Sequence, residues 1–198
     1  MSSVPAKQAL SASPLAAPRS TGAPEIVIRD ATPGDMEAVQ RIYAYHVLQS
    51  TATFEEQPPD VQEMRSRLAQ VQAQGTPWLV AEINGEIVGY CYAALYRPRV
   101  AYRYTLEDSI YLAEGQTGKG LGKALLAALL ERCEQGPWRQ MIAVIGGTNN
   151  VGSIALHRSL GFAHAGTQVA TGYKFKQWID VVFMQRALGE GSSTPPKA

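Results

Sequence analysis

Cysteine is scarce in this sequence: among 198 residues there are two, Cys91 and Cys133. Two cysteines allow at most one disulfide and cannot form a cysteine-only metal site. We interpret each as a small buried hydrophobe in a reducing compartment rather than as half of a bridge. The sequence therefore favours a cytoplasmic protein with no metal.

An excess of either charge is also missing, since 18 basic and 17 acidic side chains leave a net charge of +1. No stretch reaches the roughly 20 consecutive apolar residues that span a bilayer. These absences argue against a nucleic-acid partner and against a membrane, so we expect a soluble protein. Any charged ligand has to be met by a local cluster of groups.

Acidic residues are absent from positions 1–24, which are rich in Ala, Ser and Pro and contain no apolar run long enough for a signal peptide. We interpret this stretch as a disordered extension, with a transit peptide as the alternative. The tail at 189–198, GEGSSTPPKA, has a linker-like composition and is also expected to be disordered. One domain over residues 25–188 remains between them, and a chain that is 45% hydrophobic can give it a substantial core.

Hydrophobic periodicity and turn signals predict alternating strands and helices over this domain. Asn84-Gly85, between two apolar runs, is the clearest of these signals and predicts a type I′ hairpin. The expected elements, in chain order, are a strand at 25–30, a helix after Thr32-Pro33, a helix from Pro58 to about Gln74, strands at 77–83, 86–96 and about 103–112, a helix at about 120–135, a strand at 141–146, a short helix at 153–160, and closing strands at about 162–171 and 173–186. This order predicts an α/β (α+β) domain with a mixed sheet and helices on both faces.

Three glycines at alternate positions, Gly118, Gly120 and Gly122, run into an apolar helical stretch in GQTGKGLGKALLAALL (115–130). Backbone N–H groups of such a loop can converge on an anion, and a helix that starts there adds the positive end of its dipole. The run therefore predicts a phosphate or pyrophosphate site.

Two familiar phosphate loops do not fit the glycine run. A Walker loop requires Ser or Thr after its Gly-Lys pair, but Gly120 follows Lys119 here. A dinucleotide-binding loop, G-x-G-x-x-G, would place Lys123 or Leu125 at its third glycine. The pattern that fits resembles the pyrophosphate loop of the GNAT family of N-acetyltransferases, Q/R-x-x-G-x-G/A, with Thr117 in place of Gln or Arg.

A second stretch, NNVGSIALHRSLGF (149–162), resembles the family signature N-x-x-A-x-x-x-Y-x-x-x-G-F. Asn150, Ser153, Gly161 and Phe162 match it, and His157 takes the Tyr position. Further segments, among them STATFEE (50–56), AYRYTLEDSIYL (101–112) and YKFKQWIDVVFMQ (173–185), are similar to the phosphinothricin acetyltransferase branch. The resemblance covers about residues 25–188.

The resemblance implies a GNAT fold with a mostly antiparallel sheet of about seven strands, and acetyl-CoA as the cosubstrate. By this likeness, backbone N–H groups around Ile110 to Leu112 would meet the oxyanion and the pantetheine arm. The remaining cofactor contacts would come from the glycine loop and the second signature. The cofactor-binding residues expected on this basis are Ile110, Tyr111, Leu112, Thr117, Gly118, Lys119, Gly120, Leu121, Gly122, Asn150 and Ser153.

Two side chains are the catalytic candidates, because acetylation of an amine requires removal of its proton. Glu107, in YTLEDSIYL, matches the acid to which the family assigns this role, directly or through water; the alternative is an ordinary solvated carboxylate. Asp108 should point to the opposite face of the sheet. His157 would protonate the departing thiolate or relay the amine's proton, or else make a structural hydrogen bond.

The acceptor would be held by Arg97, Arg99 and Tyr102, which match positions that bind acidic groups in the relatives. An arginine fork suits a carboxylate or phosphinate. The alternative is a surface loop with solvated arginines. Phe54 would line the same pocket or belong to the core.

The resulting hypothesis is acetylation of the α-amino group of a small acceptor such as phosphinothricin, methionine sulfoximine or methionine sulfone, by direct attack. Such activity would give herbicide resistance, and the likeness also implies a homodimer. Two alternatives stay open: a GNAT enzyme for another amine or a protein N-terminus, and a non-catalytic coenzyme A-binding module.

Overall fold

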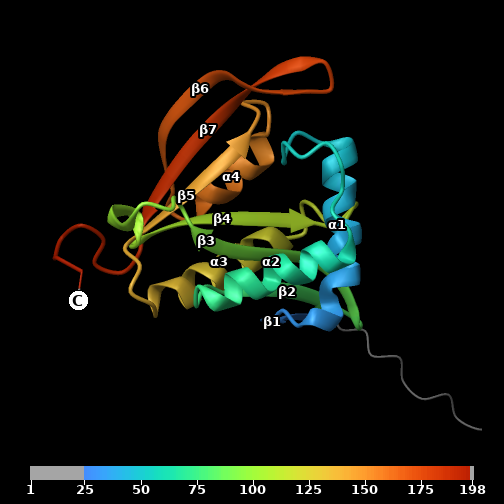
Figure 1. The fold of residues 1–198 in the computed structure, drawn as a ribbon, viewed down its shortest axis with the longest axis horizontal. Helices are drawn as coiled ribbons and strands as arrows, with labels where there is room; N and C mark the ends of the chain where they lie inside the picture. The colour runs from blue at the N-terminus through green and yellow to red at the C-terminus, as the bar shows by residue number, and fades with distance from the viewer. Residues whose placement is uncertain (1–24, 197–198) are drawn as a thin grey trace, which may run out of the picture.

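A computed structural model describes residues 25–196 of the chain (Figure 1). The extension expected over 1–24, and residues 197–198, lie outside the described residues. The elements follow in the order β1 (Ile26–Asp30), η1 (Pro33–Asp35), α1 (Met36–Gln49), α2 (Val61–Ala73), β2 (Trp78–Ile83), β3 (Glu86–Leu95), η2 (Val100–Tyr102), β4 (Thr105–Leu112), α3 (Leu121–Glu134), β5 (Gln140–Gly146), α4 (Val151–Ser159), β6 (Ala163–Lys174) and β7 (Gln177–Ala187). The predicted order of strands and longer helices is confirmed.

The strands form one seven-stranded sheet in the order β1-β2-β3-β4-β5-β7-β6. Within residues 25–196, β4 and β5 are the one parallel pair, and the other neighbours are antiparallel. The sheet is therefore mixed and mostly antiparallel, as the resemblance implied.

Helices cover both faces of the sheet, also as predicted. On one face α1 and α2 bury side chains such as Met36 and Leu68 against Trp78 and Tyr90 of β2 and β3. On the other, α3 packs a row of leucines against the same strands and against β4, and Leu156 of α4 adjoins this cluster. Figure 1 shows α2 in front of the sheet and α3 behind it.

The β2–β3 hairpin forms where Asn84-Gly85 predicted it. Both turn residues have positive φ, 52° at Asn84 and 84° at Gly85, and the flanking strands pair Ile83 with Glu86. A type I′ turn requires this conformation, which Asn and Gly adopt at little cost.

The closing hairpin differs from the sequence expectation of strands at 162–171 and 173–186. The turn lies at Phe175-Lys176, with φ of 52° and 61°, and Gly172 sits beside a register shift inside β6. The expected break between the strands falls at 172, a glycine, which is a common turn residue. Here that glycine accompanies a bulge, while two residues with side chains make the turn.

The β4–β5 pairing ends before either strand does. It runs from Thr105 opposite Gln140 to Asp108 opposite Ala143, although β4 continues to Leu112 and β5 to Gly146. The two strands part from this point, and their facing edges are left without a strand partner in the described structure. We call this opening the split.

The segment after β7 packs against Arg139. The Arg139 guanidinium donates hydrogen bonds to Glu190 Oε2, Thr194 Oγ1 and the Pro195 carbonyl oxygen. β7 ends at Ala187, next to the domain boundary expected at 188. Across the described residues, no helix is both long enough and apolar enough to cross a membrane.

Candidate active site

A cavity of about 1010 Å³ opens at the split. It runs from the N-terminus of α3, past β4, α4 and the end of β5, to the segment that follows α1. Twelve residues expected at the site line it: Phe54, Glu107, Ile110, Tyr111, Leu112, Thr117, Gly118, Gly120, Gly122, Asn150, Ser153 and His157. The geometry thus brings most of the candidates into one space.

Glu107 lies beside the last β4–β5 residue pair, opposite Ile142, and its side chain is only partly exposed. Burial raises the pKa of Glu107 from 4.5 to about 7; the neighbouring Asp108 charge acts in the same direction, and Arg97 opposes it. A carboxyl group that titrates near neutral pH can both take and hold a proton, which suits a general base.

Asp108 turns to the opposite face of β4, as the alternation along a strand predicts. There its Oδ2 lies 3.0 Å from His157 Nε2, and both side chains are buried. Asp108 Oδ1 is also buried and has no hydrogen-bond partner among residues 25–196. His157 is therefore the group that compensates this carboxylate.

His157 has a hydrogen-bond acceptor at each ring nitrogen, because Nδ1 lies 2.8 Å from the Ser153 carbonyl oxygen. Burial opposes a charged ring, but the hydrogen bond and charge of Asp108 outweigh it and raise the pKa of His157. An imidazolium that donates to both acceptors fits this geometry. The ring lines the cavity wall, and its role as a proton donor to the thiolate stays a prediction.

The glycine loop enters α3 with Gly118 and Gly120 in the left-handed region, at φ of 76° and 81°. A Cβ at either position would meet nothing within 4 Å, so it would project into open space. Gly122, in the first turn, comes close to Leu112 and Leu156, where a Cβ would lie 3.5 and 3.3 Å from their methyl groups. The first N–H groups of α3 lack intrahelical partners and are available to an anion.

Two residues expected at the cofactor do not present their side chains to the cavity. Leu121 is 1% exposed and belongs to the core, so it could contribute only its backbone. Lys119 is exposed and donates to Gln116 Oε1 at 3.3 Å. Lys123, which the sequence reasoning did not select, lines the cavity instead.

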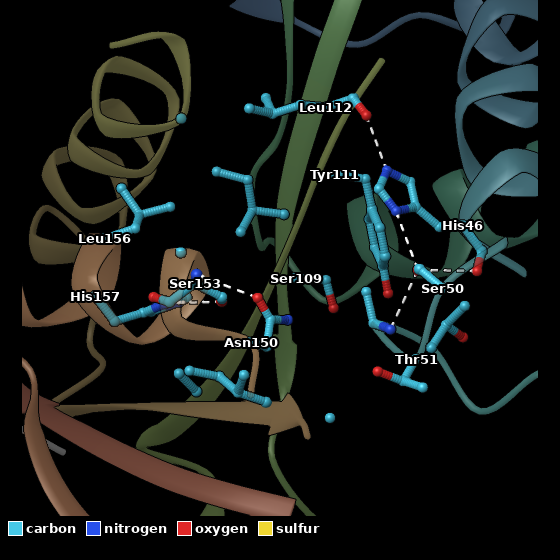
Figure 2. Close-up of a pocket in the computed structure, with 18 of the residues that line it drawn as sticks. His46, Ser50, Thr51, Ser109, Tyr111, Leu112, Asn150, Ser153, Leu156 and His157 are labelled. Carbon is cyan, nitrogen blue, oxygen red and sulfur yellow. Dashed lines mark hydrogen bonds between the residues drawn. The ribbon is translucent and has the colours of Figure 1, made fainter. Parts of the chain in front are cut away.

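Asn150 begins α4 as its N-cap, with Oδ1 accepting a hydrogen bond from the Ser153 N–H at 3.3 Å (Figure 2). This bond leaves the amide NH₂ of Asn150 free to donate to a ligand. Ile110 to Leu112 lie on the part of β4 beyond its pairing with β5. Their contact with the pantetheine arm stays a prediction.

The acceptor residues divide into two groups. Phe54 lines the cavity, whereas Arg97, Arg99 and Tyr102 are exposed outside it. Arg97 stacks its guanidinium 4.9 Å from the Tyr96 ring centre. The charge of Arg97 acts to lower the pKa of Glu107, against the larger effect of burial.

Sequence reasoning missed His46, which lines the cavity from the last turn of α1. Its Nε2 lies 2.8 Å from the Leu112 carbonyl oxygen, across β4 from the α4 residues (Figure 2). Burial lowers the pKa of His46, with the Lys174 charge acting in the same direction, so the ring is neutral and donates to Leu112. Nothing in the local sequence signals this contact, since 66 positions separate the two residues.

A split sheet, a glycine-rich helix N-terminus and a carboxyl group of raised pKa together define a site for acyl transfer from a coenzyme A thioester. The chain belongs to the GNAT acetyltransferase family, because the Acetyltransferase (GNAT) domain matches residues 28–183.

Relatives of known name agree with this assignment. The chain is 52% identical over 171 residues to a phosphinothricin N-acetyltransferase of Alcaligenes faecalis, covering 86% of this chain and 85% of that protein. It is 39% identical over 169 residues to an L-methionine sulfoximine/L-methionine sulfone acetyltransferase of Pseudomonas paraeruginosa, covering 85% and 98%. A GNAT superfamily phosphinothricin acetyltransferase from Sinorhizobium meliloti, solved in complex with acetyl-CoA, superimposes with a TM-score of 0.84 at 47% identity, over 87% of this chain and 93% of that one.

The glycine loop can be tested by Gly120→Val. The side chain would fill the space beside the α3 N-terminus, so we expect acetyl-CoA affinity to fall at least about tenfold, roughly 1.4 kcal/mol. Gly115→Val is a matched control: its φ is 73°, a Cβ there also meets nothing within 4 Å, and it does not line the cavity. Calorimetric titration of both folded variants with acetyl-CoA measures the difference. Equal affinities would contradict the role of the glycine loop in binding acetyl-CoA.

The base can be tested through the pH dependence of kcat/KM. Glu107 must be ionised to accept a proton, so activity should fall as pH drops through its pKa of about 7. Glu107→Gln should lose this limb and about 10²–10⁴-fold in rate, with little change in acetyl-CoA affinity. The amine of the acceptor titrates in the same way with the wild type and with Glu107→Gln. The difference between the two pH profiles of kcat/KM therefore measures the ionisation of Glu107.

His157→Gln provides the second arm of this measurement. A proton-donating imidazolium would give an alkaline limb that the variant loses, whereas a ring that only holds Asp108 would leave the profile's shape unchanged. Identical acidic limbs in the wild type and in Glu107→Gln would assign the base elsewhere.

Proposed function

We propose that this chain is an acetyl-CoA-dependent N-acetyltransferase that modifies the α-amino group of a small amino-acid-like acceptor by direct attack in a ternary complex. The observation that carries the proposal is Glu107, a carboxyl group with a pKa of about 7, in a cavity that leads to the glycine-rich N-terminus of α3. The names of the relatives support the same activity.

Acetyl-CoA supplies the acetyl group as a thioester. Glu107 takes a proton from the acceptor's ammonium group, directly or through a water, and leaves a neutral nitrogen that forms the new C–N bond as the C–S bond breaks. Backbone N–H groups between Ile110 and Leu112 donate to the carbonyl oxygen as it gains negative charge. The leaving thiolate takes its proton from His157 or from solvent, and the nitrogen gives up its second proton to the same ring or to solvent as the amide forms.

The cysteines support direct attack rather than an acetyl-enzyme. Burial raises the pKa of Cys91 well above its usual value and that of Cys133 to about 12. Neither thiol lines the cavity. A buried thiol that stays protonated is a poor nucleophile.

Phosphinothricin, methionine sulfoximine and methionine sulfone are the acceptors we propose. Arg97, Arg99 and Tyr102 would attract and bind their acidic or polar groups, and Phe54 would contact the chain of the acceptor. Herbicide resistance would follow from acetylation of phosphinothricin.

The test is release of free thiol from acetyl-CoA in the presence of an amine panel. We expect turnover with these three compounds, and none with their N-acetyl derivatives, which lack the reacting amine. Glutamate, methionine and a peptide with a free N-terminus complete the panel. Preference for the peptide would favour the protein-N-terminus alternative, and no turnover with any amine would favour the non-catalytic module.

We also propose that the protein is a cytoplasmic homodimer. Free buried cysteines support the location. The hairpin of β6 and β7 supports the assembly, since it carries four exposed apolar side chains, which we call the hairpin patch: Val169, Tyr173, Phe175 and Trp178, at 78%, 57%, 50% and 67% exposure. Patches of this kind mark protein interfaces.

Trp178→Glu tests the assembly, because it places a charge in the hairpin patch. Sedimentation velocity should show a dimer for the wild type and a monomer for the variant. Val100→Glu alters an equally exposed apolar residue on η2 and should leave the mass unchanged. A wild-type monomer would refute the proposal.

A further inference from the structure

Residues 50–54 cross the open end of the split, from the C-terminus of α1 to the end of β5 and to β6. Phe54 lies there between two glycines: a Cβ added at Gly172 would collide with its ring, and one added at Gly146 would meet its Cε1 at 3.3 Å and collide with the Thr51 carbonyl oxygen. The two glycines leave room for this segment, which forms one wall of the cavity.

Lys174, at the end of β6, is the residue that ties this segment to the closing hairpin. It is 2% exposed, and its Nζ donates to the carbonyl oxygens of Ser50 at 2.9 Å and Thr53 at 2.7 Å. No carboxylate within residues 25–196 forms an ion pair with it at 4 Å or less. Burial lowers the pKa of Lys174, although Glu56 and Glu55 act in the opposite direction.

Burying an ammonium group without a close counterion costs free energy, so a position as buried as 174 would ordinarily hold an apolar side chain. The two carbonyl oxygens offset part of the cost, and the Phe175 ring lies 4.9 Å from Nζ. What the lysine provides, and an apolar residue could not, is a pair of directional bonds to a loop without regular structure.

The other side of the segment is anchored independently. Tyr43 of α1 shares a 2.8 Å hydrogen bond with Thr53 Oγ1 and donates to Glu55 Oε1 at 2.8 Å. Arg67 of α2 forms an ion pair with the same carboxylate at 2.7 Å. These contacts fix the segment to the helices, whereas Lys174 fixes it to the hairpin across the split.

We propose that Lys174 is a positioning residue for the acceptor: its bonds to Ser50 and Thr53 fasten the segment across the split and hold Phe54 in the cavity wall. Lys174 does not line the cavity, so it acts through Phe54 and not by contact with the acceptor. The role in acceptor binding rests on the proposed function. The role of Lys174 in holding residues 50–54 against the hairpin does not.

The kinetic test is Lys174→Met, which keeps the length of the side chain and removes the donor. We expect the acceptor KM to rise about tenfold, roughly 1.4 kcal/mol, with the acetyl-CoA KM and kcat within about twofold. Lys176→Met is the matched control, the same substitution on an exposed lysine of the same hairpin, and should change neither constant. A lower folded fraction would reduce only the apparent kcat, so a loss confined to kcat would overturn the proposal.

A double-mutant cycle tests the route through Phe54. Phe54→Ala should itself raise the acceptor KM, and combining it with Lys174→Met should add little, because the lysine acts by placing that ring. Additive effects of the two substitutions would contradict the proposal. If Lys174→Met does not fold, Lys174→Gln retains a shorter donor and should show a smaller rise in the same constant.

Hydrogen exchange gives a readout independent of turnover. In the unliganded protein, Lys174→Met should speed amide exchange across residues 50–56, and Lys176→Met should not. Unchanged exchange at residues 50–56 in Lys174→Met would contradict the claim that Lys174 holds this segment in place, even if activity fell. If no amine is acetylated, the proposed function fails, and this measurement still decides the role of Lys174.

Discussion

The parting of β4 and β5 after Asp108 and Ala143 is the constraint on which the site depends. A parallel pair that stops early leaves backbone donors and acceptors on both edges, and such groups need partners. The cavity lies between these edges, with Ile110 to Leu112 on one side and Ala143 to Gly146 on the other. An extended amide-containing arm, such as pantetheine, has the shape and the hydrogen-bonding groups to replace the missing strand pairing.

The two-residue period of β4 divides its adjacent carboxylates between two environments. Glu107 faces the side of α1 and forms no ion pair at 4 Å or less within residues 25–196, and its pKa of about 7 follows mainly from burial. Asp108 faces α4 and is held by His157. One strand thus supplies a carboxyl group that can exchange a proton near neutral pH and another whose charge is compensated internally. Asp108 still acts on Glu107 in this arrangement, because its charge adds to the rise in the pKa of Glu107.

Features encoded by a few neighbouring residues could be predicted from the sequence. The Asn84-Gly85 turn is one, and the glycine loop that runs into α3 is another. Contacts between segments far apart in the chain could not be predicted in this way. His46 meets a carbonyl oxygen 66 positions away, and Lys174 bonds to Thr53 over 121. The Phe175-Lys176 turn was missed for a related reason: tertiary pairing of β6 with β7 holds both residues at positive φ without Gly or Asn.

Four of the six buried polar side chains among residues 25–196 lie at or beside the cavity, and burying them gives up stability for the site. Thr53, Asp108 and His157 line the cavity, and Lys174 holds the segment that closes it. An apolar residue would cost less free energy to bury at each of these positions, because desolvated charges and hydroxyl groups require directional partners. Those partners have fixed geometry. His157 fixes Asp108 and with it the adjacent Glu107, and Lys174 fixes the loop that carries Phe54. Arg97 and Arg99 are exposed outside the cavity and carry no such cost, because water still solvates their charges.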